Sequence, residues 1–202
     1  MNTNNDIKQK IRGNSFKDHK ANLLDCGKIK ILEWQNPNTK CDYVKYIFDD
    51  NKIYVSDDLG EAVYKLTYTD INSFNEINIG DFHEKLTAFS DNKYCFDSDQ
   101  AVERLKEWKE YLLEERKFED DFEKQEFMDN IEGLIDGADN CSDKDEWAFN
   151  YVNGMYQDFI AHTDGSYFLW IYDIGTSIPY RIHKHLIGLQ MASEQLKDSE
   201  NK

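Results

Sequence analysis

The sequence predicts an α+β fold, in which an N-terminal antiparallel β-meander of about four strands packs with a C-terminal set of three to five helices. Short runs of β-branched and aromatic residues, separated by turns, fill residues 28–68. Helical periodicity then dominates residues 97–196. With 12 Tyr, 12 Phe and 4 Trp, the chain has enough large apolar groups for a core. We expect a flexible leader over residues 1–20 and a single domain over residues 21–202.

The predicted strands follow one another with short connections. Each connection contains residues that favour turns, such as Asn36-Pro37 and Asp57–Gly60. Parallel strands need long crossovers, so these connections require antiparallel pairing. This excludes a doubly wound nucleotide-binding fold. The four predicted strands span residues 28–34, 43–48, 52–56 and 62–68.

The helices are predicted from apolar residues spaced three or four apart. Phe82, Leu86 and Phe89 indicate a short helix over residues 81–89. Gly137 suits the end of a helix over residues 120–136. The aromatic run YFLWIY at 167–172 favours a buried strand, with a helix as the alternative. Further predictions are a short strand or link at 94–96 and helices over residues 98–117, from Trp147 and from Pro179.

Negative charge is concentrated between Asp97 and Glu146, where 19 acidic residues face 7 basic ones. On the helix predicted over residues 98–117, one stripe is apolar and the opposite stripe is acidic. Like charges four residues apart, such as Glu103 and Glu107, destabilise an isolated helix by a few tenths of a kcal/mol. Two interpretations stay open. The stripe is either an ordinary solvated face or a docking surface.

Composition excludes several classes of function. A net charge of −16 disfavours contact with nucleic acid phosphates and with anionic membranes. No run of apolar residues is long enough for a membrane span, and the polar N-terminus does not resemble a secretory signal. The four cysteines are widely spaced, which favours free thiols over a zinc site. We therefore expect a cytoplasmic protein with no cofactor, no membrane contact and a basic partner.

Three groups of residues could suggest a chemical site, but helix geometry, ligand spacing or turn chemistry argues against each of them. His183 and His185 lie two residues apart, so on a helix they point about 200° away from each other and cannot share one metal ion. The acidic loop at 136–146 fails the calcium-binding template, because Cys141 takes the position of the glycine. Turn chemistry accounts for the acidic cluster at 57–61. We assign no catalytic residue and no metal ligand.

Three stretches resemble a loose family of small acidic proteins from phages and prophages of Gram-positive bacteria. They are IYVSDDLGEAVYKLTY at 53–68, DFHEKLTAFS at 81–90 and HLIGLQMASEQLK at 185–197. The family has a GD-x-G turn between strands, an F-x-x-K-x-x-A helix and a closing GL-x-x-A-x-x-Q-L helix. Asp57 stands where the family often has glycine. The resemblance implies a phage accessory product in a bacterial cytoplasm and carries over no catalytic residue.

The prediction that follows is a non-enzymatic interaction module. It would inhibit a nucleic-acid-handling host or defence protein through a negatively charged helical surface that mimics nucleic acid. One alternative is a small enzyme or ligand-binding domain that uses residues such as His83, His162 and Asp164. Another is a self-associating structural phage protein. The residues predicted to bind the partner are Glu103, Glu107, Glu110, Glu114, Glu119, Asp120 and Asp121.

Overall fold

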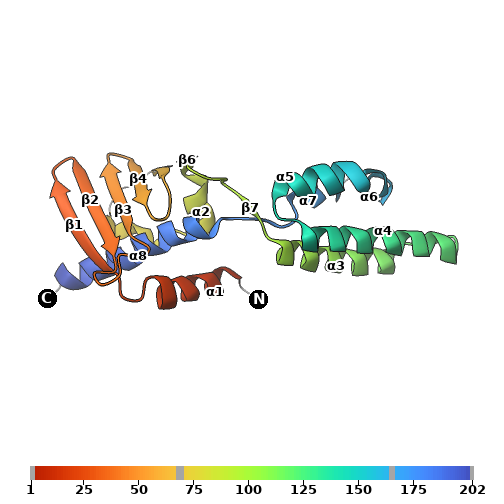
Figure 1. Cartoon of the computed structure of the whole chain (residues 1–202), viewed down its shortest axis with the longest axis horizontal. Helices are drawn as coiled ribbons and strands as arrows, with labels where there is room; N and C mark the ends of the chain where they lie inside the picture. The colour runs from red at the N-terminus through yellow and green to blue at the C-terminus, as the bar shows by residue number, and fades with distance from the viewer. Residues whose placement is uncertain (1–2, 67–70, 164–166, 201–202) are drawn as a thin grey trace. The chain divides into compact units, whose positions relative to one another are not determined.

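The computed structural model describes residues 3–66, 71–163 and 167–200, and it confirms the α+β class. Where the sequence predicts one domain, the contacts divide the chain into two compact units. The sheet unit comprises Met1–Lys93 and Ile178–Lys202, and the helical unit comprises Tyr94–Ser177 (Figure 1). Each unit has its own apolar core. In the described part of the chain, no helix is both long and apolar enough to cross a membrane.

The sheet unit contains a six-stranded antiparallel meander whose spatial order follows the sequence. The four predicted strands correspond to β2 to β5, so the meander is confirmed but is longer than expected. Residues 67 and 68 of the fourth predicted strand lie outside the described residues. The strands are β1 (Lys20–Cys26), β2 (Ile29–Gln35), β3 (Val44–Asp49), β4 (Lys52–Asp57), β5 (Ala62–Lys65) and β6 (Leu86–Phe89).

The helix predicted over residues 81–89 is wrong in its second half. Helix α2 spans Ile79–Glu84, and the chain then extends as β6, which pairs with β5. Phe82 and Leu86 are both buried, so the apolar spacing is satisfied by a helix followed by a strand. Backbone pairing with β5 therefore overrides the local periodicity. A short 3-10 helix, η2 (Ile71–Glu76), precedes α2.

Residues 3–20 differ from the predicted flexible leader. They contain helix α1 (Thr3–Lys10) and a π-helical turn, η1 (Ile11–Ser15), before β1 begins at Lys20. Ile11 and Phe16 are fully buried in the core of the sheet unit. Two apolar anchors in a polar segment are too few to give a clear periodic pattern, but their burial fixes the segment.

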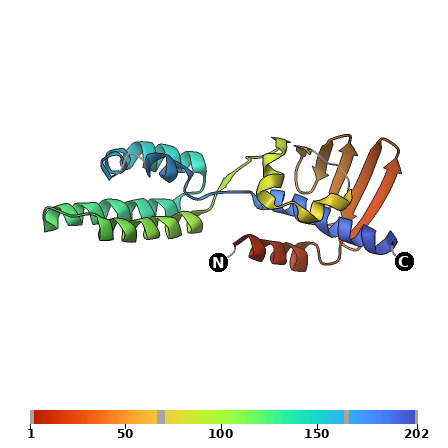
Figure 2. The same cartoon turned by 180° about the vertical axis from the view of Figure 1, so that it is seen from behind.

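Helix α8 (Tyr180–Glu200) packs on one face of the sheet, as Figures 1 and 2 show. The hydroxyl of Tyr46 donates a hydrogen bond to the carbonyl oxygen of His185 at 3.0 Å. A Cβ atom at Gly188 would lie 2.4 Å from the same hydroxyl, so glycine allows the helix backbone to approach the sheet. The buried side of α8 includes Ile182, Leu186 and Leu189, as its periodicity predicts.

The helical unit begins and ends in a two-stranded ribbon, in which β7 (Cys95–Phe96) pairs with β8 (Thr176–Ser177). Between these strands the chain forms an antiparallel hairpin of two long helices and a layer of shorter ones (Figure 1). The unit is thus inserted in the sequence between β6 and α8. Its helices are α3 (Ser98–Glu115), α4 (Asp121–Asn140), α5 (Lys144–Glu146), the π-helix η3 (Trp147–Met155), α6 (Gln157–Thr163) and α7 (Tyr167–Asp173).

Two predictions in this unit are wrong. The aromatic run at 167–172 forms helix α7 and not a strand, which leaves the alternative interpretation correct. Gly137 does not end its helix, because α4 continues to Asn140. A Cβ atom at Gly137 would lie 2.5 Å from the Tyr151 ring. Glycine is needed there for close packing of η3 on α4.

Candidate functional site

Helix α3 separates the two stripes that the sequence predicts. Its inward stripe is buried in the core of the helical unit and comprises Ala101, Leu105, Trp108 and Leu112. Its outward stripe is exposed and comprises Glu103, Glu107, Glu110 and Glu114. Among the residues that the structure describes, none of these four carboxylates forms an ion pair. Four negative charges therefore lie along about three turns of helix, and the exposed Lys106, one turn from Glu103 and from Glu110, borders them.

Two of the basic residues on α3 are turned away from this stripe. The guanidinium of Arg104 lies over the ring of Trp170, at 5.9 Å from the ring centre. The ammonium of Lys109 lies 2.8 Å from the Glu132 carboxylate on α4. Both cations are thus held by groups at the flanks of α3. The sequence contains these charges, but only the structure shows that they do not neutralise the outward stripe.

Helix α4 contributes a second outward stripe, which the sequence analysis did not identify. Its inward side is formed by the buried Phe127, Ile131, Leu134 and Ala138. At 100° per residue, Phe122, Asp129 and Asp136 point to the opposite side. All three are exposed, and Phe122 is 77% exposed. The spacing of seven residues between them was the available signal. The carboxylates of α3 and α4 thus face away from the shared core.

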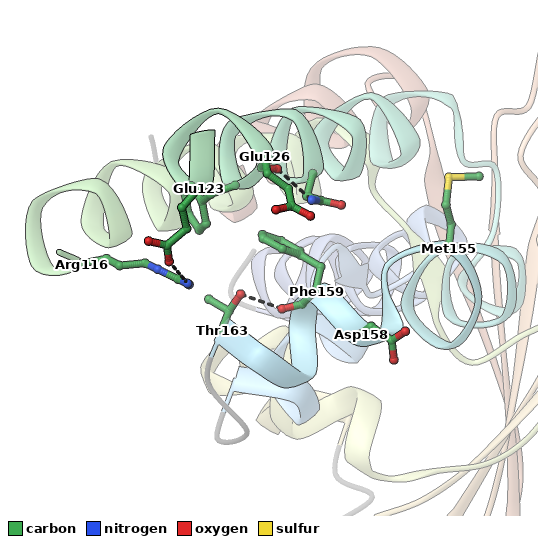
Figure 3. A pocket seen from close by; sticks show the side chains of 9 residues that line it. Arg116, Glu123, Glu126, Met155, Asp158, Phe159 and Thr163 are labelled. Carbon is green, nitrogen blue, oxygen red and sulfur yellow. Dashed lines mark hydrogen bonds and ion pairs between the residues drawn. The ribbon is translucent and has the colours of Figure 1, made fainter. Parts of the chain in front are cut away.

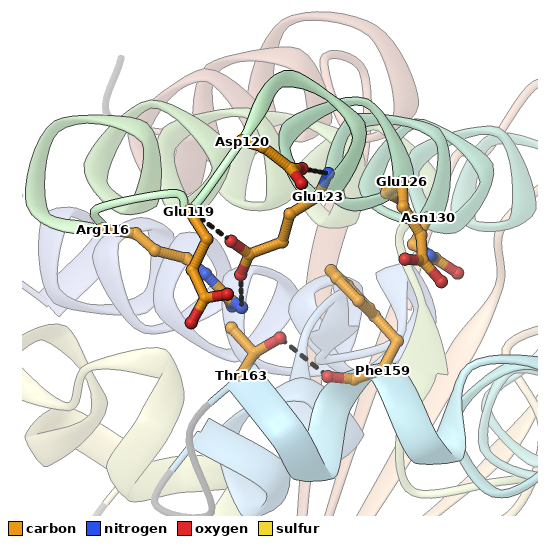
Figure 4. A network of polar contacts seen from close by, with 8 residues as sticks. All are labelled: Arg116, Glu119, Asp120, Glu123, Glu126, Asn130, Phe159 and Thr163. Atoms are coloured by element: carbon orange, nitrogen blue, oxygen red, sulfur yellow. Dashed lines mark hydrogen bonds and ion pairs between the residues drawn. The ribbon is translucent and has the colours of Figure 1, made fainter.

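Glu119 and Asp120 lie in the turn between α3 and α4 (Figure 4), and Asp121, the last candidate residue, is the first residue of α4. The Asp120 carboxylate caps α4 by accepting a hydrogen bond of 2.8 Å from the Glu123 amide. The Glu123 carboxylate accepts from the Glu119 amide at 2.6 Å and pairs with Arg116 at 3.0 Å. These contacts lower the pKa of Glu123. Negative charge also suits a helix N-terminus, so part of this cluster is explained by the stability of α4.

A pocket of about 330 Å³ lies between α4 and α6 in the helical unit (Figure 3). The rings of Phe127 and Phe159 meet in it with centres 5.6 Å apart. Its wall combines carboxylates with the guanidinium of Arg116, which is already paired with Glu123. An aromatic surface beside carboxylates suits a cationic group. The lining residues are Arg116, Glu123, Glu126, Phe127, Asn130, Met155, Asp158, Phe159 and Thr163.

Two histidines of the sheet unit, His183 and His185, are buried on helix α8. The His185 ring is fully buried, with Nδ1 2.8 Å from the Tyr64 hydroxyl and Nε2 3.3 Å from the Leu59 carbonyl oxygen. Burial lowers the pKa of His185 to about 4. Burial, followed by the nearby His83, also lowers the pKa of His183. The expectation that His183 and His185 lie on different sides of a helix agrees with these separate surroundings.

Among the alternative catalytic residues, the structure describes the surroundings of the His83 side chain. His83 is 8% exposed, and its Nε2 lies 2.8 Å from the Lys93 carbonyl oxygen in the sheet unit. Asp164 and the side chain of His162 lie outside the described residues. A second pocket, of about 280 Å³, includes His183, but its described lining has no carboxylate. In the described part of the chain, no three potential metal ligands gather.

Comparison with known proteins gives no relative for this chain. No protein-family model, no curated protein and no solved structure matches it.

Proposed function

We propose that the helical unit is a docking module that binds a basic protein surface through the outer face of the α3–α4 hairpin. The observation that carries this proposal is the carboxylate stripe on α3. Two of the three cations of this helix are held by Trp170 and Glu132, which leaves Lys106 beside four glutamates. Four carboxylates with one neighbouring cation leave a net negative field available to a partner. Association with the partner should therefore be fast and sensitive to salt.

The proposed partner is a protein with a nucleic-acid-binding groove. Carboxylates one helical turn apart recur about every 5.4 Å, which is close to the spacing scale of phosphates along a strand. The resemblance to phage proteins suggests a host or defence protein in a bacterial cytoplasm as the target. Phe122, the exposed aromatic residue of the α4 stripe, would supply an apolar anchor at this surface.

The test is affinity purification from bacterial lysate at low and high salt. The variant carries Glu103→Gln, Glu107→Gln, Glu110→Gln and Glu114→Gln. We expect the wild-type chain to capture proteins at low salt and to release them at high salt or when duplex DNA is added. The variant with four Gln should lose this capture, because the local field that attracts the partner is removed.

A matched control removes four exposed carboxylates from the sheet unit, with Asp18→Asn, Asp50→Asn, Glu76→Gln and Glu84→Gln. It has the same net charge as the test variant. If both variants lose the same proteins, capture depends only on overall charge and the docking face is not where we place it. Unchanged capture by the Gln variant would also contradict the proposal.

A further inference from the structure

The sheet unit has an apolar row that crosses all six strands. The strand register pairs Leu24 with Ile31, Ile31 with Ile47 and Ile47 with Tyr54. It then pairs Tyr54 with Val63 and Val63 with Ala88. Six apolar side chains, one from each strand, therefore stand side by side on one face. We call this set the apolar row.

The apolar row lies on the face of the sheet opposite α8. Side chains alternate along a strand, and the neighbours Leu32, Tyr46 and Val55 are buried on the α8 face. No member of the apolar row belongs to the core of described residues in this unit. Leu24 is 46% exposed, and Ile29 beside the row is 40% exposed. A hollow of about 360 Å³ lies over its β4 to β6 end.

Charged side chains flank the apolar row on both sides. On one side, Glu33 and Lys45 are paired neighbours on β2 and β3. On the other side, Asp49 lies opposite Lys52 in the register of β3 and β4, and Lys52 lies opposite Lys65 in the register of β4 and β5. Glu61, just before β5, extends the first flank. The Asp57 carboxylate also lies 3.9 Å from the Lys45 ammonium on the first flank. The first flank is thus net negative, and the second flank is net positive.

We propose that this face binds a second copy of the same chain, with a two-fold axis running along the apolar row. This axis places the apolar row of one copy against the apolar row of the other. It also places the first flank of each copy against the second flank of the other copy. On β3, Lys45 then faces Asp49 of the second copy, and on β5, Glu61 faces Lys65. An axis parallel to the strands, between β3 and β4, would place Asp49 opposite Lys52 but would also place Glu33 opposite Glu61. Charge complementarity therefore selects the first arrangement.

The size of the face sets the expected affinity. Six strands spaced about 4.8 Å apart are about 24 Å wide, and four or five residues of each strand extend about 15 Å. The flat footprint is thus about 360 Å² on each copy, below the roughly 800 Å² per partner of a typical specific interface. The dimer should therefore be weak and should dissociate on dilution.

The first experiment measures the mass of the full chain by sedimentation equilibrium over a range of concentrations. We expect the mass to rise from one copy towards two. Ile47→Lys places a charge at the centre of the apolar row and should weaken the dimer by about tenfold or more. Phe149→Lys is the matched control, because Phe149 is 78% exposed on the helical unit and should leave the dimer unchanged.

The second experiment exchanges charges and does not depend on the folding of the Ile47 variant. Lys45→Glu and Asp49→Lys should each weaken the dimer, since each creates a like-charge contact across the axis. The double variant should restore it. A mass that stays at one copy throughout overturns the proposal, even if the face binds another protein. So does a dimer that Ile47→Lys and the charge exchange leave unaltered while Phe149→Lys dissociates it.

Discussion

His185 shows how one buried side chain ties the sheet to helix α8. The Leu59 carbonyl oxygen only accepts hydrogen bonds, so Nε2 of His185 carries the proton and Nδ1 accepts from Tyr64. This neutral tautomer satisfies both ring nitrogens inside the core. Adding a second proton would bury a positive charge next to the hydrophobic residues of the sheet unit, which is why burial lowers the pKa of His185.

This environment predicts a pH-dependent stability. The pKa of His185 is about 4 in the folded protein against an ordinary value of 6.5. As the pH falls, the unfolded chain therefore takes up the proton first. The stabilisation is fully present above about pH 6.5, and between pH 6.5 and pH 4 the free energy of unfolding should fall by on the order of 3 kcal/mol from this residue.

The measurement is urea unfolding of wild type and His185→Gln at several pH values. Glutamine keeps a donor and an acceptor but does not titrate. Burial also lowers the pKa values of His19 and His183, so both proteins should retain some slope of the same sign. The slope in the variant should be smaller. Equal slopes would show that His185 is not the dominant titrating group.

At the scale of elements, the start of α4 explains part of the acidic cluster without any partner. The Asp120 side chain satisfies the Glu123 amide, and Asp121 and Glu123 lie in the first helical turn. Both features stabilise a helix N-terminus. The α3 stripe has no equivalent explanation, since its four glutamates follow one face along the helix. The test of docking therefore targets α3 and leaves Asp120 in place.

The cap has its own test in thermal unfolding. We expect Asp120→Ala to reduce the free energy of unfolding by about 1 kcal/mol, because the Glu123 amide loses its acceptor. Asp121→Ala removes the same charge from the next position without removing a cap, and it should cost only a few tenths of a kcal/mol. Equal effects of the two substitutions would show that charge alone, and not capping, stabilises the start of α4.

At the scale of the whole molecule, the helical unit is an insertion in the chain of the sheet unit. The β7–β8 pairing places Cys95 beside Ser177, so the unit begins and ends at one point. Its core is formed by its own residues, among them Trp108, Trp147 and Ile131. Domains inserted through adjacent ends commonly fold independently.

We therefore expect residues 94–177 to fold when expressed alone. The fragment should show a helical circular dichroism spectrum and a cooperative thermal transition. The sheet unit, with residues 94–177 replaced by a short Gly-Ser linker, should keep a β-rich spectrum. A fragment that shows no cooperative transition would mean that the helical unit depends on the rest of the chain.

The sequence by itself determined the local elements whose patterns are long and regular. Strands β2 to β5 follow from β-branched and aromatic runs between turns, and α3 follows from an apolar stripe opposite a carboxylate stripe. Local spacing was enough in these elements because burial of one face dictates the period. The residues of the α3 stripe were predicted for the same reason, and the structure finds them exposed on one side.

Only the tertiary structure decided the rest, because the deciding contacts join residues far apart in the chain. Leu86 to Phe89 become a strand by pairing with β5, and Gly137 stays inside α4 because Tyr151 packs on it. The pairing of Lys109 with Glu132, which holds this cation away from the α3 stripe, is also a contact between helices. The apolar row appears only when six strand registers are aligned. A sequence lists its charges and apolar groups, but packing decides which of them remain available to a partner.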